Sequence, residues 1–176
     1  MKRYLNIFFI GFLLILSSCD DNFDEINTDP NRAGADIFDP NLILPNVLAG
    51  YANTTVGYSG SILFQSMWTQ TLASTTTGGA NYYSNGDKYV ASGSINSYIQ
   101  NVWNSDFANA SRADQMEKLS SENPDLVNLQ ALGKMMKVLN LSFITDIYGD
   151  IPYSEALMAE EGITQPVYDK QEVLYP

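Results

Sequence analysis

The sequence predicts an all-α fold built from paired amphipathic helices. Apolar residues recur at three- and four-residue steps over two long segments, 94–119 and 124–148, which is the period of a helix with one buried face. Capping residues and prolines stand where helices should begin. A polar break of only four residues, 120–123, separates the two segments, so we expect them to pack as neighbours in a bundle or helical repeat.

The N-terminus has the pattern of a secretory signal peptide. Lys2 and Arg3 precede an apolar run over 7–16, and small residues follow. The run has about half of the roughly twenty residues that a membrane-spanning helix needs. We therefore expect residues 1–18 to be a signal peptide rather than a permanent membrane span.

Cys19 follows directly, and residues 16–19 resemble the lipobox of bacterial lipoproteins. Cys19 is the only cysteine of the chain, so it has no partner for an internal disulfide. A cysteine that carries two or more acyl chains is a stable membrane anchor. We expect lipidation at Cys19 and an acidic tether over residues 19–38. The first acidic residues of the tether either are simply solvated or resemble the surface-export signals of some Gram-negative lipoproteins: Asp20, Asp21, Asp24 and Glu25.

Composition excludes several functions. Without Lys2 and Arg3 the chain keeps seven basic and twenty acidic residues, a formal charge of −13, which argues against nucleic-acid binding. The chain has no histidine, so Ser-His-Asp catalysis and the usual zinc sites are excluded, and we expect no cofactor. Carboxylate chemistry of the glycosidase kind is the remaining catalytic alternative, but no pair of carboxylates is singled out for it.

The first half of the chain is expected to hold two helices and a long loop. Asp39 can cap a helix with Pro40 at its first position, and Pro45 should end or kink the first turn. Residues 74–93 show no period, and a loop of this length in a compact domain is often functional. Between the first helix and this loop, a second helix is expected over 60–73. Its apolar side is formed by Ile62, Leu63, Met67, Trp68 and Leu72. The helix over 94–119 has its apolar face formed by Ile95, Ile99, Val102, Trp103, Phe107 and Ala110.

The helix over 124–148 has the clearest pattern. Asn123 is a good N-cap and Pro124 suits the first position, while Gly149 should end the helix in a left-handed conformation. Ala131 and Gly133 are small enough for another helix to approach closely. The apolar stripe is expected to be Leu126, Leu129, Leu132, Met136, Leu139, Phe143 and Ile147, with Lys134 and Lys137 on the other side.

A tight connector is expected after this helix, followed by a loop and the start of a further helix over 169–174 that the chain does not complete. Asp146 and Asp150 flank the turn, but their spacing fits no calcium loop, which needs six or more oxygen ligands. We expect a structural role in helix termination, with Tyr148 and Tyr153 packed nearby.

Three blocks of sequence together resemble one family. Residues 19–31 (CDDNFDEINTDPN) are similar to the mature start of SusD/RagB-type nutrient-binding outer-membrane lipoproteins. Residues 143–156 (FITDIYGDIPYSEA) are similar to the family's most recognisable block, and residues 165–172 (QPVYDKQE) to the segment that opens its next helix. Members of the family are several times longer, so the resemblance identifies 39–176 as the N-terminal part of a SusD-like domain, incomplete and with long loops.

The resemblance implies tetratricopeptide-like helix pairs and a binding function. SusD-like proteins sit at the cell surface and capture oligosaccharides, or in some branches peptides. They pass these ligands to a TonB-dependent transporter of the SusC type, which is then the expected partner, and they do not cleave them. A second hypothesis is a structural or interaction lipoprotein that contacts the transporter without binding ligand itself.

The long loop carries the candidate ligand-binding residues. Aromatic faces can stack on sugar rings, and amides and carboxylates can bond hydroxyls, as in pockets with a few placed polar groups. The alternative is that the tyrosines only pin the loop to the helices, and Trp68 and Trp103 are expected in the core. The candidates are Asn81, Tyr82, Tyr83 and Asp87, with Asn85 and Tyr89 nearby.

Overall fold

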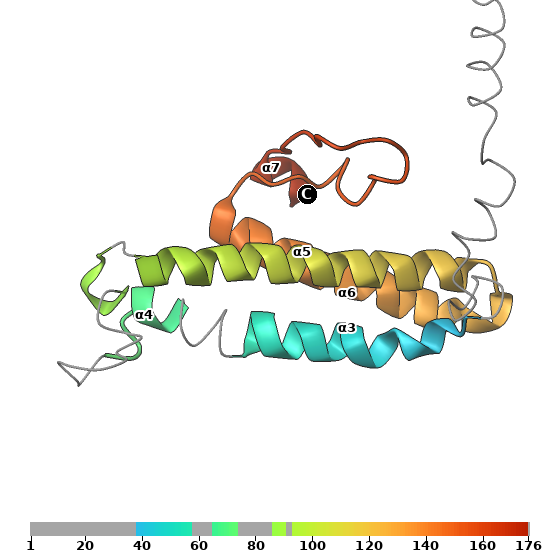
Figure 1. Ribbon diagram of the computed structural model, residues 1–176, viewed down its shortest axis with the longest axis horizontal. Coiled ribbons are helices and arrows are strands. Elements are labelled where there is room, and N and C mark those ends of the chain that lie inside the picture. Colours follow the sequence, from blue (N-terminus) through green and yellow to red (C-terminus); the bar gives the residue numbers. More distant parts are fainter. Residues whose placement is uncertain (1–37, 58–64, 74–85, 91–92, 176) are drawn as a thin grey trace, which may run out of the picture. The chain divides into compact units, whose positions relative to one another are not determined.

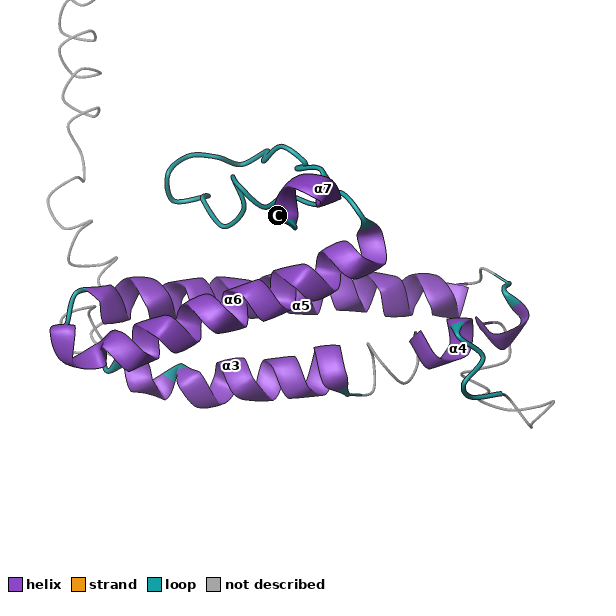
Figure 2. Ribbon diagram, turned by 180° about the vertical axis from the view of Figure 1, so that it is seen from behind, coloured by secondary structure: helices purple, strands orange, loops and turns teal. Residues whose placement is uncertain are grey.

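The structure is a computed structural model that describes residues 38–57, 65–73, 86–90 and 93–175. The chain divides into two units, Met1–Phe38 and Asp39–Pro176, and the described elements belong to the second. They are helices and loops, with no strand among the described residues (Figure 2). The prediction of an all-α fold is confirmed.

The first helical segment begins as the sequence predicts. Asp39 caps the 3-10 turn η1 (Pro40–Leu42) by accepting a hydrogen bond from the backbone N–H of Asn41 at 2.9 Å. Helix α3 (Leu44–Tyr51) follows with Pro45 in its first turn, where a proline removes no helical hydrogen bond. It continues into a five-residue π-helix, η2 (Ala52–Val56), a conformation that is rare in proteins.

Two long helices form the body of the described chain. Helices α5 (Gly93–Ser121) and α6 (Val127–Tyr148) run side by side in opposite directions, and α3 lies along the same pair (Figure 1). The 3-10 turn η5 (Pro124–Leu126) joins them, and Asn123 caps it by accepting from the N–H of Asp125 at 3.0 Å. The predicted cap and the predicted helix pair are both confirmed.

Gly133 sets the distance between α5 and α6. A Cβ atom at this position would lie 2.9 Å from the amide nitrogen of Glu117 and 3.0 Å from the carbonyl oxygen of Ala113, both in the backbone of α5. The predicted close approach at Gly133 is therefore confirmed. Ala131, the other small residue, is exposed.

The apolar face of α6 was predicted correctly in its first half and shifts in its second half. Leu129 and Met136 are buried as expected, but Phe143 and Ile147 are only half-buried. Instead Ile144 and its neighbours are buried because the chain after α6 folds back onto this half. Their cluster is Ala110, Leu141, Ile144 and Ile151, with Trp103, Phe107, Tyr148, Leu157 and Leu174 packed against it.

Buried polar side chains join α3, α5 and α6. Asn109 donates from Nδ2 to the carbonyl oxygen of Val47 at 3.0 Å and to Oδ1 of Asn140 at 3.2 Å. Asn140 donates in turn to the carbonyl oxygen of Met136 at 2.7 Å. A buried polar group costs free energy unless it is bonded, so this chain of bonds favours one alignment of the three helices.

One predicted helix ends earlier than expected. The described part of the segment over 60–73 forms helix α4 (Ser66–Trp68) and then turns, because Gln70 adopts a left-handed conformation with φ 54°. The hydroxyl of Thr69 donates to the carbonyl oxygen of Gln65 at 2.9 Å, a local bond that competes with helix continuation. Leu72, predicted to lie on the apolar side, is exposed.

The segment after α6 is held by hydrogen bonds from its own polar side chains. Gly149 ends α6 with φ 79°, a conformation that suits glycine, as predicted. Ile151 and Asp169 form an isolated antiparallel bridge. The Asp169 carboxylate accepts from the N–H groups of Tyr153 and Ser154 at 3.0 and 2.7 Å. A short helix, α7 (Gln171–Leu174), follows.

The two carboxylates that flank the end of α6 have structural bonds. Asp150 accepts from the N–H of Gln171 at 3.1 Å, and Asp146 accepts from the hydroxyl of Tyr175 at 3.0 Å. Both carboxylates therefore have structural bonds, but these bonds hold the chain after α6 and do not end the helix, which was the predicted role. Tyr148 packs against the core as expected. Tyr153, predicted to pack as well, is exposed.

Candidate functional site

Most of the predicted ligand-binding residues lie outside the described part of the chain. They are Asn81, Tyr82 and Tyr83. The predicted lipidation site, Cys19, also lies outside the described residues. Asp87 is described and lies in a 3-10 turn, η4 (Gly86–Lys88). The structure therefore places the end of the candidate loop, where the chain returns towards α5.

This end of the loop is anchored to α4. Gln70 donates from Nε2 to the carbonyl oxygen of Asp87 at 2.9 Å. Gly86 packs so closely on Met67 that a Cβ atom there would lie 2.6 Å from the Met67 Cβ. Met67 is fully buried, with Tyr98 and Ile99 of α5 packed against it. Asp87 is thus held on the helical scaffold.

An aromatic pair marks the same place. The rings of Trp68 and Tyr89 lie 5.5 Å apart at an angle of 31°. Trp68 is half-buried beside Met67, in agreement with the predicted core position, whereas Tyr89 is 58% exposed. Tyr89 also has φ 55°, and a non-glycine residue in this region is strained and is often found at functional sites. The sequence signal for this pair was one aromatic residue in the helix before the aperiodic loop and another within the loop, near its end.

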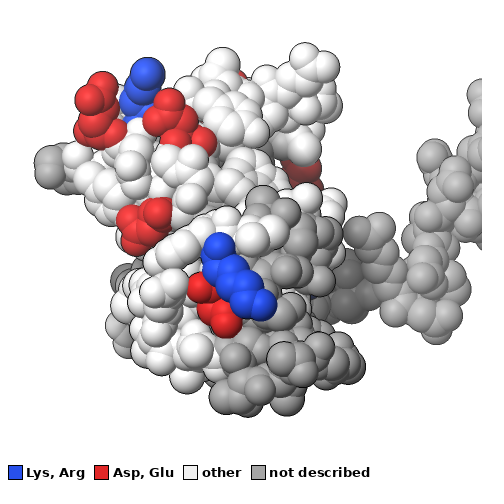
Figure 3. Space-filling view, turned by 90° about the vertical axis from the view of Figure 1, so that its left-hand side faces the viewer, with Lys and Arg blue, Asp and Glu red and all other residues white. Residues whose placement is uncertain are grey.

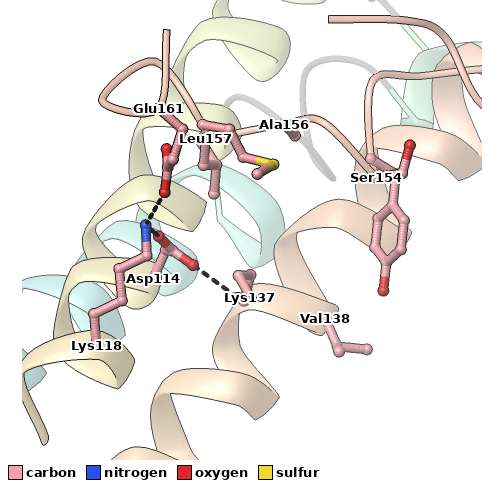
Figure 4. Close-up of a pocket in the computed structure, with 10 residues that line it drawn as sticks. Asp114, Lys118, Lys137, Val138, Ser154, Ala156, Leu157 and Glu161 are labelled. Atoms are coloured by element: carbon pink, nitrogen blue, oxygen red, sulfur yellow. Dashed lines mark hydrogen bonds and ion pairs between the residues drawn. The ribbon is translucent and has the colours of Figure 1, made fainter. Parts of the chain in front are cut away.

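A groove lies elsewhere, along the α5/α6 pair. It has a volume of about 330 Å³ and lies between these two helices and the chain over 153–161. Figure 4 shows Asp114, Lys118 and Glu161 at one end of it and Ser154 at the other. The remaining lining residues are Lys137, Val138, Tyr153, Ala156, Leu157 and Met158.

Ion pairs organise the charged end of the groove. Lys137 lies 2.8 Å from Oδ1 of Asp114 and 2.9 Å from Oε2 of Glu117. Lys118 lies 3.0 Å from Oδ2 of Asp114 and 3.7 Å from Oε1 of Glu161. Lys137, expected on the side of α6 away from the apolar stripe, is therefore half-buried against α5. The two carboxylates of α5 draw it there.

Asp114 and Lys137 stay charged at neutral pH. Burial raises the pKa of Asp114, but hydrogen bonds from Lys137 and Lys118 outweigh it, and the pKa lies below its usual value. Burial lowers the pKa of Lys137, but its bonds to Asp114 and Glu117 outweigh that effect and raise it. The end of the groove is thus a fixed array of donors and acceptors.

Asp106 is a buried carboxylate between α5 and the π-helix η2. Its Oδ1 accepts from the hydroxyl of Thr55 at 2.6 Å, and its Oδ2 is buried without a hydrogen-bond partner among the described residues. Burial raises the pKa of Asp106 to about 6, although the bond from Thr55 lowers it. Asp106 faces the interior of the bundle and lines neither the loop end nor the groove.

The described residues offer neither a metal centre nor a membrane-spanning helix. Within them, no three His, Cys, Asp or Glu side chains gather closely enough to hold a metal ion. No helix of the described part combines the length and hydrophobicity needed to cross a bilayer. On the face seen in Figure 3, small groups of acidic side chains stand among neutral residues, with few basic ones beside them.

A comparison with known protein families gives a match. A model of the SusD-like family, described as starch-binding and associating with the outer membrane, matches residues 32–176. No curated protein and no solved structure matches the chain. The matched residues include all the helices described above.

Proposed function

The chain belongs to the SusD-like family, and from this premise we propose that it is a cell-surface lipoprotein that binds a nutrient and delivers it to a TonB-dependent transporter of the SusC type. The nutrient is an oligosaccharide or a peptide. The family's description names starch binding and the outer membrane and points to a binding protein rather than an enzyme.

The observation that carries the proposal is the family match over residues 32–176. The loop end adds local support. Asp87 and the exposed ring of Tyr89 are fixed to α4, at the edge of the segment that holds Tyr82 and Tyr83. An anchored aromatic surface loses little entropy on binding, which favours affinity.

In the proposed site, Tyr82 and Tyr83 provide flat aromatic faces for the ligand. Asn81 and Asp87 bond its polar groups, which fixes its orientation. The paired rings of Trp68 and Tyr89 lie at the end of the loop.

Isothermal titration calorimetry of the full chain with maltoheptaose, and separately with a tryptic peptide digest, tests the binding. We expect one of the two to bind. Changing Tyr82 and Tyr83 together to alanine should weaken that binding at least about tenfold, or 1.4 kcal/mol. Tyr168→Ala is the matched control, because Tyr168 is an exposed tyrosine outside the loop, and it should leave the affinity unchanged.

Two results would contradict this assignment. Equal affinity of the loop variant and the unchanged chain would remove the loop from the site. Absence of binding to both ligands would favour the interaction lipoprotein described below.

Lipidation at Cys19 is tested separately by mass spectrometry of the chain expressed in a Gram-negative host. We expect the mature N-terminus at Cys19 with the added mass of a diacylglyceryl group and a fatty acid. Cys19→Ser should remain unprocessed and unlipidated. Protease treatment of intact cells then tests surface exposure, and a chain that is degraded only after lysis would contradict it.

A second candidate function is a lipoprotein that contacts the transporter without binding ligand. The exposed apolar side chains near the C-terminal end of the described chain favour it, because such patches mark contact surfaces: Val167, Tyr168, Val173 and Tyr175. Co-purification with a co-expressed SusC-type transporter, compared between the unchanged chain and Val173→Asp, tests it. Unchanged recovery of the transporter would contradict a contact through this surface.

A further inference from the structure

We propose that the groove between α5, α6 and residues 153–161 is a second binding site, for a neutral polyhydroxylated compound of mono- or disaccharide size. This site differs from the one proposed at the loop, because none of residues 86–89, the described end of that loop, lines the groove. Its binding therefore does not require the loop site to be correct.

The size of the groove limits the ligand. Its volume of about 330 Å³ is at the lower end of the range of roughly 300–1,000 Å³ found for small-molecule sites. One or two sugar rings fit such a space, and a longer oligomer would have to extend into solvent.

The charges of the lining residues favour a neutral ligand. Lys118 and Lys137 are balanced by Asp114 and Glu161, so the lining carries no net charge. An anionic ligand would meet the two carboxylates, and a cationic ligand would meet the two ammonium groups. Each would lose as much from repulsion as it gains from attraction.

The ion pairs leave hydrogen-bonding capacity that hydroxyls can use. A carboxylate has about four acceptor positions, and each oxygen of Asp114 bonds one lysine. An ammonium group has three donors, and Lys118 meets two carboxylates, one of them only at 3.7 Å. A hydroxyl can donate to Asp114 and accept from Lys118 without breaking either pair. A zwitterion would have to separate the pairs to obtain partners of its own.

Apolar side chains form the rest of the lining. Val138 is 57% exposed in α6, and Leu157 and Met158 lie across from it. Sugar rings present C–H groups on their faces, and these can cover such side chains. Leu157 is held in a left-handed conformation with φ 63°, which directs it onto the core cluster beneath the groove.

The test is a two-dimensional ¹H–¹⁵N NMR titration of the full chain in a detergent without a sugar headgroup. The probes are glucose, maltose, glucosamine, glucuronate and the dipeptide glycyl-leucine. We expect maltose to shift the amide signals of Lys137, Val138 and Leu157. Glucosamine and glucuronate should bind at least about fivefold more weakly than glucose, because each must desolvate a charge for which a lining of zero net charge offers no net attraction.

Two variants with matched controls locate the binding. Val138→Trp fills the groove and should weaken maltose binding at least about tenfold. Val127→Trp, at an equally exposed valine of α6 outside the groove, should not. Lys118→Met should also weaken it, whereas Lys134→Met, at an exposed lysine that does not line the groove, should not.

The titration separates this proposal from the proposed function. Shifts confined to residues near Tyr89 would overturn the groove site and support the loop site. Shifts confined to the groove would support the groove site and overturn the loop site. Shifts in the groove with glycyl-leucine but not with the neutral sugars would overturn the assigned ligand class.

Discussion

Helices α5 and α6 and the segment over 150–175 are neighbours in sequence but are held in place by different interactions. The helix pair buries its apolar side chains and brings two backbones together at Gly133. The segment over 150–175 exposes many of its apolar side chains and is held by side-chain bonds to backbone N–H groups, most of them exposed. Burial gives the helices a stability that such bonds in water do not.

This difference bears on the groove, because each region supplies one of its walls. The wall formed by α5 and α6 belongs to the most stable part of the described chain. The wall over 153–161 rests on few buried contacts and can open locally at low cost. We therefore expect a ligand in the groove to change the conformation of residues 153–161 and to leave that of α5 and α6 unchanged.

Truncating a core residue should have the largest effect on the helix pair. Ile144 is fully buried in α6, and Ile144→Ala should lower the free energy of unfolding by about 2–5 kcal/mol. Val138→Ala, on the exposed side of the same helix, should change it by less than about 0.5 kcal/mol. Urea denaturation followed by circular dichroism measures both. Similar losses would show that α6 is not packed as described.

Enlarging Gly133 tests the close helix contact. Gly133→Leu forces a side chain against the backbone of α5 and should cost about 1–3 kcal/mol. Ala131→Leu, at an exposed position of the same helix, should be nearly neutral. If the two variants melt at the same temperature, the helices do not meet at Gly133.

Acidification should act in opposite directions on the two regions. The pKa of Asp106 is raised to about 6, so the folded chain holds a proton that the unfolded chain releases between pH 3.8 and about 6. The contribution of Asp106 to stability therefore falls as the pH rises through this window, by on the order of 2 kcal/mol or less.

Hydrogen bonds from the backbone N–H and hydroxyl of Ser154 and from the N–H of Tyr153 lower the pKa of Asp169. The contribution of Asp169 to the stability of the fold is present above its unfolded pKa. It is lost as the pH falls through the lowered pKa of the folded chain.

The Asp106→Asn variant isolates the contribution of Asp106 to the pH dependence of stability. The variant keeps an acceptor for Thr55 and has no charge to bury, so it should be more stable than the unchanged chain at pH 7 and equally stable near pH 4. Denaturation midpoints across this pH range measure the difference. A constant difference between the two chains at all pH values would mean that Asp106 does not titrate in this window.

Removing a charge at the groove should have a smaller effect. Lys137→Met leaves Asp114 and Glu117 without their closest cation and should cost about 1 kcal/mol. Lys134→Met, at an exposed lysine 4.0 Å from Glu117, should cost less than about 0.5 kcal/mol. Denaturation in low and high salt distinguishes them, since salt screens an exposed pair more than a half-buried one.

The smallest effect on overall stability is expected from Asp169→Asn. The variant weakens the bonds to Tyr153 and Ser154, so the amides of these two residues should exchange with deuterium much faster. Exchange in α5 and α6 should be unchanged. Glu172→Gln, at an exposed residue of α7, is the control. Faster exchange throughout the chain would show that the two regions unfold as one.

The sequence predicted the local features well and the long-range ones less well. The caps at Asp39 and Asn123, the end of α6 at Gly149 and the close approach at Gly133 depend on neighbouring residues or on the size of one side chain. The early end of α4 was missed, because it depends on a left-handed Gln70. The shift of the buried face of α6 was also missed, because the segment that covers it comes later in the chain.

The groove gave little signal in the sequence because its lining comes from three separate stretches. Asp114 and Lys118 are spaced for an ion pair within one helix, and this was the available hint. That Lys137 joins them depends on how α6 packs on α5.

By itself, the sequence determined that the chain is helical, where most of its helices begin and end, and which family it belongs to. These properties follow from the period of apolar residues, from capping chemistry and from short motifs. Only the tertiary structure decided which polar side chains are buried, where α4 stops, and that α5, α6 and residues 153–161 enclose a groove. These depend on contacts between residues far apart in the chain, whose energies arise only when the helices pack together.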